Sequence, residues 1–415
     1  MSEDEDQVLL VSLFLGINSK CANTRLVQSE LRELARTAGA RVADSLSITV
    51  RKPDPGTLIG KGQIQRILSI CRSKKCRAVI FDHDLLPRQQ TNLEKRLGRK
   101  VIDRTTLILD IFAQQARTSE GKLQVERAQI DYLLPRLSQL WVQFSRLAGG
   151  IGTRGPGETQ IESDRRELRK RMSILDKRLE RVRSRRSITR SSRRKKGYPI
   201  VSLVGYTNAG KTSLMRSLTG HGPPASDSLF ATLDPLTRQL DMPNSQPLLL
   251  TDTVGFIQRL PTRLIASFRA TLEEIADSDV ILHVVDGASP SCSLQIDTVI
   301  ELLEDIGVSH LPTITVYNKS DLPNFLAPPK RLGALVVSTK SGYGLKELKL
   351  ELQSVVDSTG VNMRLRIPFD KARLLALIYQ SGSVKSLRHC TTDSIVEASV
   401  PTELASRLGI YIDNS

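Results

Sequence analysis

The sequence predicts an α/β protein of several domains, and three features of the chain support that fold class. Residues 8 to about 118 alternate short apolar runs with segments of helical periodicity, which is typical of a small α/β domain with mainly parallel strands. A charged stretch of helical periodicity follows and predicts a long helical hairpin. Beyond residue 197, apolar strands end in polar or glycine-rich segments, which predicts a mixed, mostly parallel sheet with helices on both faces. We expect domain ranges of 1–118, 119–196, 197–358 and 359–415, the last a small α+β domain.

The bulk composition indicates to which broad class of protein the chain belongs: globular, membrane-spanning or secreted. Its 415 residues exceed one typical domain core, and 40% hydrophobic with 25% charged residues match soluble globular proteins. No stretch reaches the roughly 20 apolar residues that cross a bilayer, and the opening residues are acidic, unlike basic targeting peptides. The five scattered cysteines fit neither a zinc site nor a disulfide framework. We therefore expect a cytoplasmic protein without a membrane span. The net charge of +16 indicates a polyanionic partner, with RNA, DNA and anionic membrane all open.

The first domain is expected to contain four short strands and a glycine-rich loop. That loop, Gly56–Gly62, contains Lys61 but lacks the Gly-Lys-Thr or Gly-Lys-Ser order of a phosphate-binding loop. We interpret it as a turn before a helix over Gln63–Cys71. The alternative is a site for ATP that assists RNA remodelling through this domain. The expected strands are Val8–Leu15, Ser47–Val50, Ala78–Phe81 and Lys100–Ile102.

Two helical stripes flank a glycine cluster in the second region. Residues 149–158 are glycine-rich, so no regular element is expected there. The simplest arrangement is a long antiparallel hairpin with this loop at its tip, and two unconnected surface helices are the alternative. The second helix continues beyond Glu180 into a basic linker with no acidic residue. The first stripe, interrupted around Pro135, comprises Ile130, Leu133, Leu137, Leu140, Trp141 and Phe144, and the second Ile161, Leu168, Met172, Leu175, Leu179 and Val182.

A glycine-rich loop between an apolar strand and a helix carries the strongest chemical signal in the chain. Strand Ile200–Val204 leads into the loop and helix Ser213–Leu218 follows, which is the context that a phosphate-binding loop requires. Glycines let backbone N–H groups surround the β-phosphate, Lys211 can reach the β- and γ-phosphates, and the Thr212 hydroxyl can take a Mg²⁺ position. The nucleotide-binding residues expected here are Gly205, Tyr206, Thr207, Asn208, Ala209, Gly210, Lys211 and Thr212.

Three further motifs follow, each at the end of an apolar strand. The motif that contains Asp321 favours guanine over adenine, because the Asp321 carboxylate can accept two hydrogen bonds from guanine. Adenine would leave this carboxylate unpaired, at a free-energy cost of about 1–3 kcal/mol. Asn318 is expected to tie the loops together, and Lys319 to lie along the base. The sequence therefore predicts GTP as substrate and Mg²⁺ as cofactor. The motifs are Asp252, Thr253, Val254 and Gly255 after Leu248–Leu250; Asn318, Lys319, Ser320 and Asp321 after Thr313–Tyr317; and Ser338, Thr339 and Lys340 after Ala334–Val337.

One more segment, between the phosphate loop and Asp252, is expected to order and disorder with nucleotide state. Its Thr232 is the candidate for completing the Mg²⁺ shell beside Thr212 when a γ-phosphate is present. Thr237 is the alternative for that role. Nucleotide-binding residues are expected throughout the segment, which consists of Phe230, Ala231, Thr232, Leu233 and Asp234.

The sequence also predicts how hydrolysis is catalysed. Phe256 stands where Ras-like proteins carry the glutamine that orients the attacking water, so slow intrinsic hydrolysis is expected. The missing group then comes from elsewhere in the chain, from a partner or from a bound cation. Asn208 is the candidate for holding such a cation, K⁺, the other interpretation being a purely structural amide. Catalytic contributions are expected from Lys211, Thr232 and Gly255.

Together these motifs resemble the HflX-type GTPases of the translation-factor-related class, over nearly the whole chain. The resemblance extends outside the nucleotide motifs to Gly56–Gly62, to Asp103, Arg104 and Thr105, and to the distinctive stretch Gly149–Gln160. It implies a ribosome-associated GTPase that binds the large ribosomal subunit. It also implies that the hairpin tip points toward the peptidyl-transferase region and that the protein splits or rescues stalled ribosomes.

The expected function is therefore a Mg²⁺-dependent GTPase that acts on ribosomes and converts GTP to GDP and phosphate. Its expected partners are the large ribosomal subunit, with its RNA and proteins, and the nucleotides GTP and GDP. A monomer is the expected form. The alternatives are a nucleotide-gated RNA- or ribosome-binding module with negligible hydrolysis, and ATP-assisted RNA remodelling through the N-terminal domain. The C-terminal domain is not assigned a role.

Overall fold

The computed structural model divides the chain into two compact units, each described by itself. The first contains Met1–Arg181, Ser228–Ala231 and Leu260–Phe268, and the second contains Val182–Asp227, Thr232–Arg259 and Arg269–Ser415. The structure describes residues 7–16, 24–137, 156–195, 198–221, 228–242, 247–259, 261, 274–326, 328, 334–400 and 402–413.

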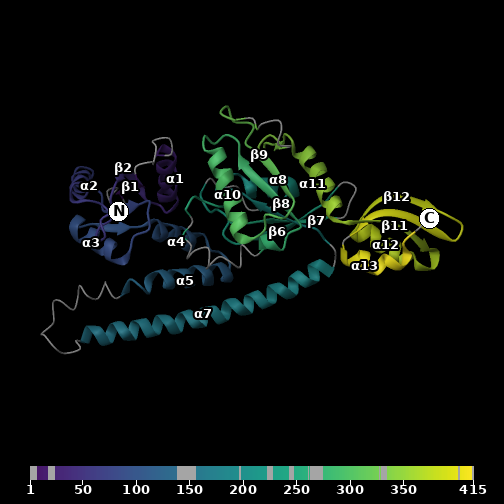
Figure 1. Ribbon diagram of the computed structural model, residues 1–415, viewed down its shortest axis with the longest axis horizontal. Coiled ribbons are helices and arrows are strands. Elements are labelled where there is room, and N and C mark those ends of the chain that lie inside the picture. The colour runs from purple at the N-terminus through teal and green to yellow at the C-terminus, as the bar shows by residue number, and fades with distance from the viewer. Residues whose placement is uncertain are drawn as a thin grey trace. The chain divides into compact units, whose positions relative to one another are not determined.

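A four-stranded sheet forms the N-terminal part of the first unit (Figure 1). Its order is β2-β1-β3-β4 and every pairing is parallel, as the alternation of strands and helices predicts. The central strand β1 is buried along nearly its whole length, because helices cover both faces of such a sheet. The elements are β1 Gln7–Leu15, α1 Thr24–Thr37, β2 Arg41–Val50, α2 Lys61–Ser73, β3 Ala78–Phe81, α3 Pro87–Leu97, β4 Lys100–Ile102 and α4 Arg104–Gln115.

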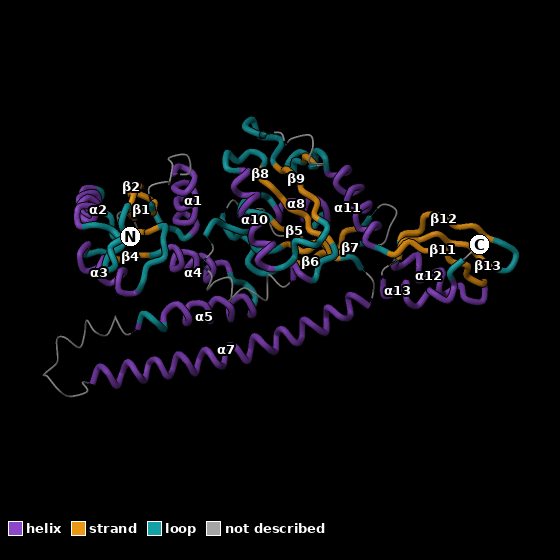
Figure 2. Tube along the Cα trace, viewed as in Figure 1, coloured by secondary structure: helices purple, strands orange, loops and turns teal. Residues whose placement is uncertain are grey.

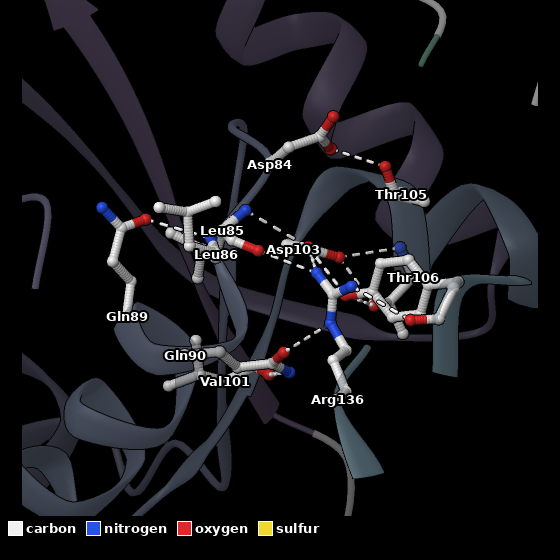
Figure 3. A network of polar contacts seen from close by, with 11 residues as sticks. Asp84, Leu85, Leu86, Gln89, Gln90, Val101, Asp103, Thr105, Thr106 and Arg136 are labelled. Carbon is white, nitrogen blue, oxygen red and sulfur yellow. Dashed lines mark hydrogen bonds and ion pairs between the residues drawn. The ribbon is translucent and has the colours of Figure 1, made fainter. Parts of the chain in front are cut away.

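A polar network at the end of β4 ties the start of the hairpin to this sheet (Figure 3). Asp103 caps α4 by accepting from the backbone N–H of Thr106 at 2.8 Å. Its other carboxylate oxygen accepts from the Tyr132 hydroxyl at 2.7 Å and from Arg136 at 3.2 Å. Arg136 also donates to the carbonyl of Leu85 at 2.7 Å, and its guanidinium lies 3.4 Å from the centre of the Tyr132 ring. The network therefore fixes where the hairpin leaves the domain.

The hairpin consists of α5, Ser119–Leu133, and the 40-residue α7, Pro156–Lys195. The two helices lie alongside each other in Figure 1 and are joined by ion pairs from Arg127 to Asp176 at 3.2 Å and from Arg171 to Glu126 at 2.7 Å. Leu175, in the predicted seam, is fully buried. The predicted glycine tip falls outside the described residues, apart from the first turn of α7.

The nucleotide-motif region of the second unit is a six-stranded sheet of order β10-β9-β8-β5-β7-β6. Only β6, paired with β7, is antiparallel among the described pairings, so the sheet is mixed and mostly parallel as predicted. Its core packs against α8 and α11. The elements are β5 Ile200–Val204, α8 Lys211–Thr219, β6 Leu236–Leu240, β7 Leu248–Asp252, β8 Val280–Asp286, α10 Cys292–Ile306, β9 Thr313–Asn318, β10 Leu335–Val336 and α11 Leu345–Thr359.

A small α+β domain ends the chain, with an antiparallel sheet of order β11-β13-β12 (Figure 2). Alternate strand residues such as Leu365, Ile367 and Val396 are buried in its own core. None of the described helices is both long and apolar enough to cross a membrane. The elements are β11 Val361–Pro368, η3 Phe369–Lys371, α12 Ala372–Ser381, β12 Ser383–His389, β13 Asp393–Val400, α13 Thr402–Leu408 and η4 Gly409–Tyr411.

Candidate functional site

The glycine-rich loop after β5 is shaped by two glycines that no other residue could replace without strain. Gly205 has a φ of +151°, and a Cβ there would lie 2.2 Å from the carbonyl oxygen of Val284. Gly210 has a φ of +93°, and a Cβ there would lie 2.2 Å from the amide nitrogen of Asn318. Helix α8 starts at the next residue, so its free N–H groups face the loop. The loop therefore has the backbone shape that binds phosphate at a helix N-terminus.

The Lys211 side chain is buried inside this loop. Its ammonium donates to the carbonyl oxygens of Gly205 at 3.1 Å and Tyr206 at 2.9 Å. Burial lowers the pKa of Lys211 to about 8, and the nearby Asp252 opposes the shift only in part. The charged lysine thus lacks enough negative charge around it, which a nucleotide phosphate would provide.

Two hydroxyls from separate segments converge on Asp252 at the end of β7. Thr212 Oγ1 lies 2.6 Å and Thr232 Oγ1 3.0 Å from the same Asp252 oxygen, and the two hydroxyls are 2.8 Å apart. Burial raises the pKa of Asp252, while its other oxygen has no hydrogen-bond partner among the described residues. Thr237 instead pairs with Thr251 at 3.1 Å between two strands.

This cluster fits a magnesium ion. Carboxylate and hydroxyl oxygens are the hard ligands that Mg²⁺ prefers, and the unpaired Asp252 oxygen is a buried acceptor that a cation or its water would satisfy. Thr212 and Thr232, the two metal ligands expected from the sequence, are the residues that the structure brings together here. Asp252 is the third member of the group.

The segment after Asp252 closes against the phosphate loop through its backbone. Phe256 accepts from the N–H of Thr207 at 2.8 Å and donates to the carbonyl of Gly205 at 3.1 Å. A Cβ on Gly255 would lie 2.8 Å from the Thr207 side chain and 3.0 Å from the Lys211 ammonium, so the chain can pass here only as glycine. The Phe256 ring is buried and has no polar atom to offer a water.

The ends of β9 and β10 form the other half of the site. The Asn318 amide donates to the carbonyl of Ala209 at 3.0 Å and accepts from the Thr339 N–H at 3.3 Å, so it connects the two loops that the sequence predicts it to tie together. The Asp321 carboxylate accepts from the Ser338 hydroxyl at 2.7 Å, a bond that lowers the pKa of Asp321. The carboxylate is therefore ionised and oriented, as a guanine acceptor must be.

Sequence reasoning missed three contacts that shape this site. Asp286, at the end of β8, forms an ion pair with Lys319 at 2.8 Å. The Tyr206 hydroxyl accepts from the Gln258 N–H at 2.8 Å. The Ser338 hydroxyl, expected to act through its backbone only, orients Asp321. The ion pair of Asp286 could have been suspected from the sequence, because Asp286 ends an apolar strand, as the Asn-Lys motif does. Nothing in the sequence indicates the contact between Tyr206 and Gln258.

The remaining expected residues are placed unevenly around the site. The Phe230 side chain is buried and packs on the ring of Phe112, and both residues belong to the first unit. The Thr253 hydroxyl donates to the Leu203 carbonyl at 2.6 Å, which holds the backbone of β5 and leaves that hydroxyl engaged. Ser320 donates its N–H to the Val337 carbonyl at 3.2 Å. Of the others, Asn208 and Asp234 are half-buried, Leu233 and Val254 are buried, Ala231 is exposed, and Lys340 is exposed.

Three family models match successive parts of the chain. They are described as GTP-binding GTPase N-terminal over residues 27–113, GTP-binding GTPase Middle Region over 115–193, and 50S ribosome-binding GTPase over 200–319. The chain is 40% identical to GTPase HflX from Caldanaerobacter subterraneus subsp. tengcongensis, over 99% of this chain and 95% of that protein. It is 41% identical to GTPase HflX from Escherichia coli, over 86% of this chain and 85% of that protein. A solved GTP-binding protein from Sulfolobus solfataricus in complex with GDP aligns at 25% identity and a TM-score of 0.44, covering 83% of this chain and 98% of that one.

Proposed function

We propose that this chain, which belongs to the HflX family of GTPases and is a GTP hydrolase, depends on Mg²⁺ for its activity. We also propose that it acts on the large ribosomal subunit and splits or rescues stalled ribosomes. The four ranges 1–118, 119–196, 197–358 and 359–415 are proposed as its working parts. The observation that carries the proposal is the convergence of the Thr212 and Thr232 hydroxyls on Asp252. It brings the phosphate loop, the switch segment and β7 to one point.

The chain's own groups suit GTP hydrolysis at that point. Lys211 would place its charge on the β- and γ-phosphates, and the backbone around Gly255, which packs against Lys211, would lie beside the γ-phosphate. Thr212, Thr232 and Asp252 would hold Mg²⁺ directly or through water. When bound, the ion supplies positive charge to the phosphate oxygens as the bond to the leaving GDP breaks.

Water activation is the step for which the described site has no side chain. Phe256 is buried and apolar, so the attacking water needs a group from a partner or from a bound monovalent cation. Asn208 is the proposed contact for K⁺, because its half-buried amide sits in the loop at a φ of +61°. We therefore propose slow hydrolysis by the free protein and faster hydrolysis on the ribosomal subunit.

The second helix of the hairpin is the proposed RNA contact. Arg166, Arg169 and Lys170 of α7 are exposed, and the helix continues after Glu180 with basic but no acidic residues. Such a surface binds backbone phosphates through charge, and the affinity then falls steeply with salt. The glycine tip, which includes Arg154, is the proposed end of the contact and lies outside the described residues.

Cosedimentation with separated ribosomal subunits, under GDP and under a non-hydrolysable GTP analogue, tests the proposal. We expect the protein to pellet with the large subunit, more strongly with the analogue. Reversing the charges of Arg166, Arg169 and Lys170 should weaken pelleting and flatten its salt dependence. The matched control reverses three exposed charges of the N-terminal domain, Arg66, Arg72 and Lys74. Equal loss in both variants would show nonspecific attraction, and no pelleting of the native protein would refute ribosome binding.

Single-turnover phosphate release separates an enzyme driven by the ribosome from a binding module. We expect the large subunit to raise the rate by at least about a hundredfold, in the range that a supplied catalytic group gives. Replacing K⁺ by Na⁺ tests the monovalent cation in the same assay. A fast free enzyme that is insensitive to subunits would show that the water-activating group is already in the chain.

A further inference from the structure

The end of β8 packs against the loop that follows β9, residues 319–326, within the second unit. Asp286 and Asn318 are the last residues of these two parallel strands and are paired in register. The N–H of Gly287 donates to the carbonyl of Asn318 at 3.1 Å, and the carbonyl of Gly287 accepts from the N–H of Leu326 at 2.8 Å. The end of β8 therefore holds this loop at both of its ends.

Gly287 allows the loop to approach the end of the strand closely. A Cβ there would lie 2.2 Å from the Phe325 ring and 3.2 Å from the carbonyl oxygen of Asn318. Within the loop, Lys319 has a φ of +66°, which is uncommon for a residue with a side chain. Such a conformation persists only where the surrounding contacts fix it.

Asp286 uses both of its carboxylate oxygens near this loop. Its Oδ2 accepts from the Lys319 ammonium at 2.8 Å, and its Oδ1 accepts from the N–H of Ala288 at 3.0 Å. The Lys319 side chain is 24% exposed and that of Asp286 is 18% exposed, so the ion pair is partly shielded from water. The bond to Ala288 keeps the carboxylate turned toward the lysine. The Lys319 ammonium is therefore held at the end of β8, and its aliphatic stem is fixed between this point and the loop backbone.

We propose that Asp286 is a positioning residue for guanine binding, which holds the Lys319 stem in the place that it takes along the face of the base. Asp286 acts through Lys319 and does not touch the nucleotide. This inference rests on the proposed function, GTP binding, and on the expected position of Lys319 along the base. A side chain that is ordered before binding loses less conformational freedom when the ligand arrives, and this difference raises affinity.

A double-mutant cycle on GDP affinity, measured by calorimetry, tests this role. Asp286→Asn keeps the shape of the side chain but not its charge, so we expect GDP binding to weaken about threefold to tenfold, the range for ordering one long side chain. Lys319→Met keeps an apolar stem without the ammonium and should weaken binding by a similar factor. The double variant should lose no more than the larger single loss, because both changes remove the same ion pair.

Asp279→Asn is the matched control. Asp279 directly precedes β8 at the opposite end of the strand, where its carboxylate accepts from the N–H of Ile200 at 2.7 Å. This variant should bind GDP as the native protein does. Inorganic pyrophosphate is the second probe, because it can contact the phosphate loop but has no base, and Asp286→Asn should bind it with native affinity. Equal losses of GDP affinity in the two variants, or equal losses for GDP and pyrophosphate in Asp286→Asn, would overturn the inference, because a loosened domain would explain them.

The outcomes separate failure of this inference from failure of the proposed function. Losses in both single variants that do not add in the double variant support the inference. Any other pattern in the cycle overturns the role of Asp286 and leaves GTP binding by the native protein intact, whereas a native protein that binds neither GTP nor GDP refutes the proposed function itself. If Asp286→Asn does not fold, a structure of the native protein with GDP decides. The Lys319 ammonium should then remain on Asp286 with its stem against the base, and an ammonium that has left Asp286 refutes the inference.

Discussion

The four-stranded parallel sheet and the mostly parallel six-stranded sheet each carry a glycine-rich loop with a lysine at the carboxyl ends of their strands, but the polar groups of these two loops are used differently. In the N-terminal loop these groups bond to one another. In the nucleotide loop and at the end of β7 they point to one place and remain incompletely bonded. Ligands of open α/β sheets bind at carboxyl ends, so the presence of a glycine-rich loop alone does not distinguish the two domains. The bonding of the polar groups within each loop does.

The N-terminal loop is a self-contained turn. Asp54 accepts from the backbone N–H groups of Gly56 and Thr57, each at 2.8 Å, and from the Thr57 hydroxyl at 3.0 Å. The hydroxyl bond is the largest cause of the lowered pKa of Asp54. The Asp103 network of Figure 3, at the end of β4, is similarly bonded, with partners on both carboxylate oxygens. This pattern supports the interpretation of Gly56–Gly62 as a turn over that of an ATP site.

The nucleotide loop is the opposite case. Among the described residues, one Asp252 oxygen and the Thr207 hydroxyl are buried without a hydrogen-bond partner. Lys211 is charged at neutral pH although its donors reach only two backbone carbonyls. Buried groups left in this state cost about 1–3 kcal/mol each, a cost that a bound ligand can remove. Between the two glycine-rich loops, this incomplete bonding thus distinguishes the nucleotide loop more clearly than the glycines do.

The largest effect should come from the buried ion pairs of the N-terminal domain. Arg104 is 3% exposed and pairs with Glu30 and, at 2.6 Å, with Asp82. Arg104→Met removes the cation between two carboxylates, so we expect about 3–5 kcal/mol less free energy of unfolding in a urea titration. GTP affinity of the folded protein should not change. The control Arg171→Met breaks a more exposed pair and should lower the free energy of unfolding far less than Arg104→Met does. A strong loss of GTP affinity in Arg104→Met would show that this network serves the nucleotide.

The two loop lysines provide the next test. Lys211→Ala should lower kcat/KM for GTP about 100- to 1000-fold, because a buried charge on the phosphates is lost. Lys61→Ala, an exposed lysine at the start of α2, should stay within about twofold. Steady-state assays with GTP and with ATP would measure both. A tenfold fall in either activity for Lys61→Ala would mean that the N-terminal loop is a second nucleotide site and that the comparison is mistaken.

The guanine half of the site gives a smaller effect. Asp321→Asn should weaken GTP binding about tenfold to a hundredfold and relax its preference over XTP, because an amide cannot accept two bonds from guanine. Competition binding of GTP and XTP measures the change. Asp54→Asn is the matched control, since Asp54 also accepts from a hydroxyl in a loop, yet belongs to the turn. An unchanged GTP-to-XTP preference in Asp321→Asn would remove this residue from base recognition.

Regular elements with sharp sequence boundaries were predictable. The strands Ala78–Phe81, Lys100–Ile102 and Ile200–Val204 have the expected limits, because apolar runs there begin and end at polar or glycine residues. Asp252 and Thr212 were each predicted to bind the nucleotide, because the motif of each comes at the end of an apolar strand, and the structure brings the two side chains within 2.6 Å of each other. The position of the Phe230 side chain could not be predicted, because it depends on Phe112 in a distant part of the chain. Strand Leu236–Leu240 was missed because an antiparallel edge strand can be polar on both faces.

The smallest expected effect is a pH dependence confined to the nucleotide loop. The pKa of Lys211 is lowered to about 8 by burial, so the free protein loses this charge as the pH rises through 8, while bound phosphate favours the charged form. GTP affinity should therefore be nearly constant below pH 7 and fall about fourfold between pH 7 and pH 8.5. Calorimetry in buffers of different ionisation enthalpy should show proton uptake on binding over this range. The control variant Lys211→Arg keeps its charge at every pH tested and should bind GTP without proton uptake. Any effect of pH on the guanine base itself is the same in both proteins. Equal pH profiles for the two proteins would show that Lys211 remains fully charged in the free protein. The hydrogen bonds around its buried charge would then be as complete as those of the Asp103 network.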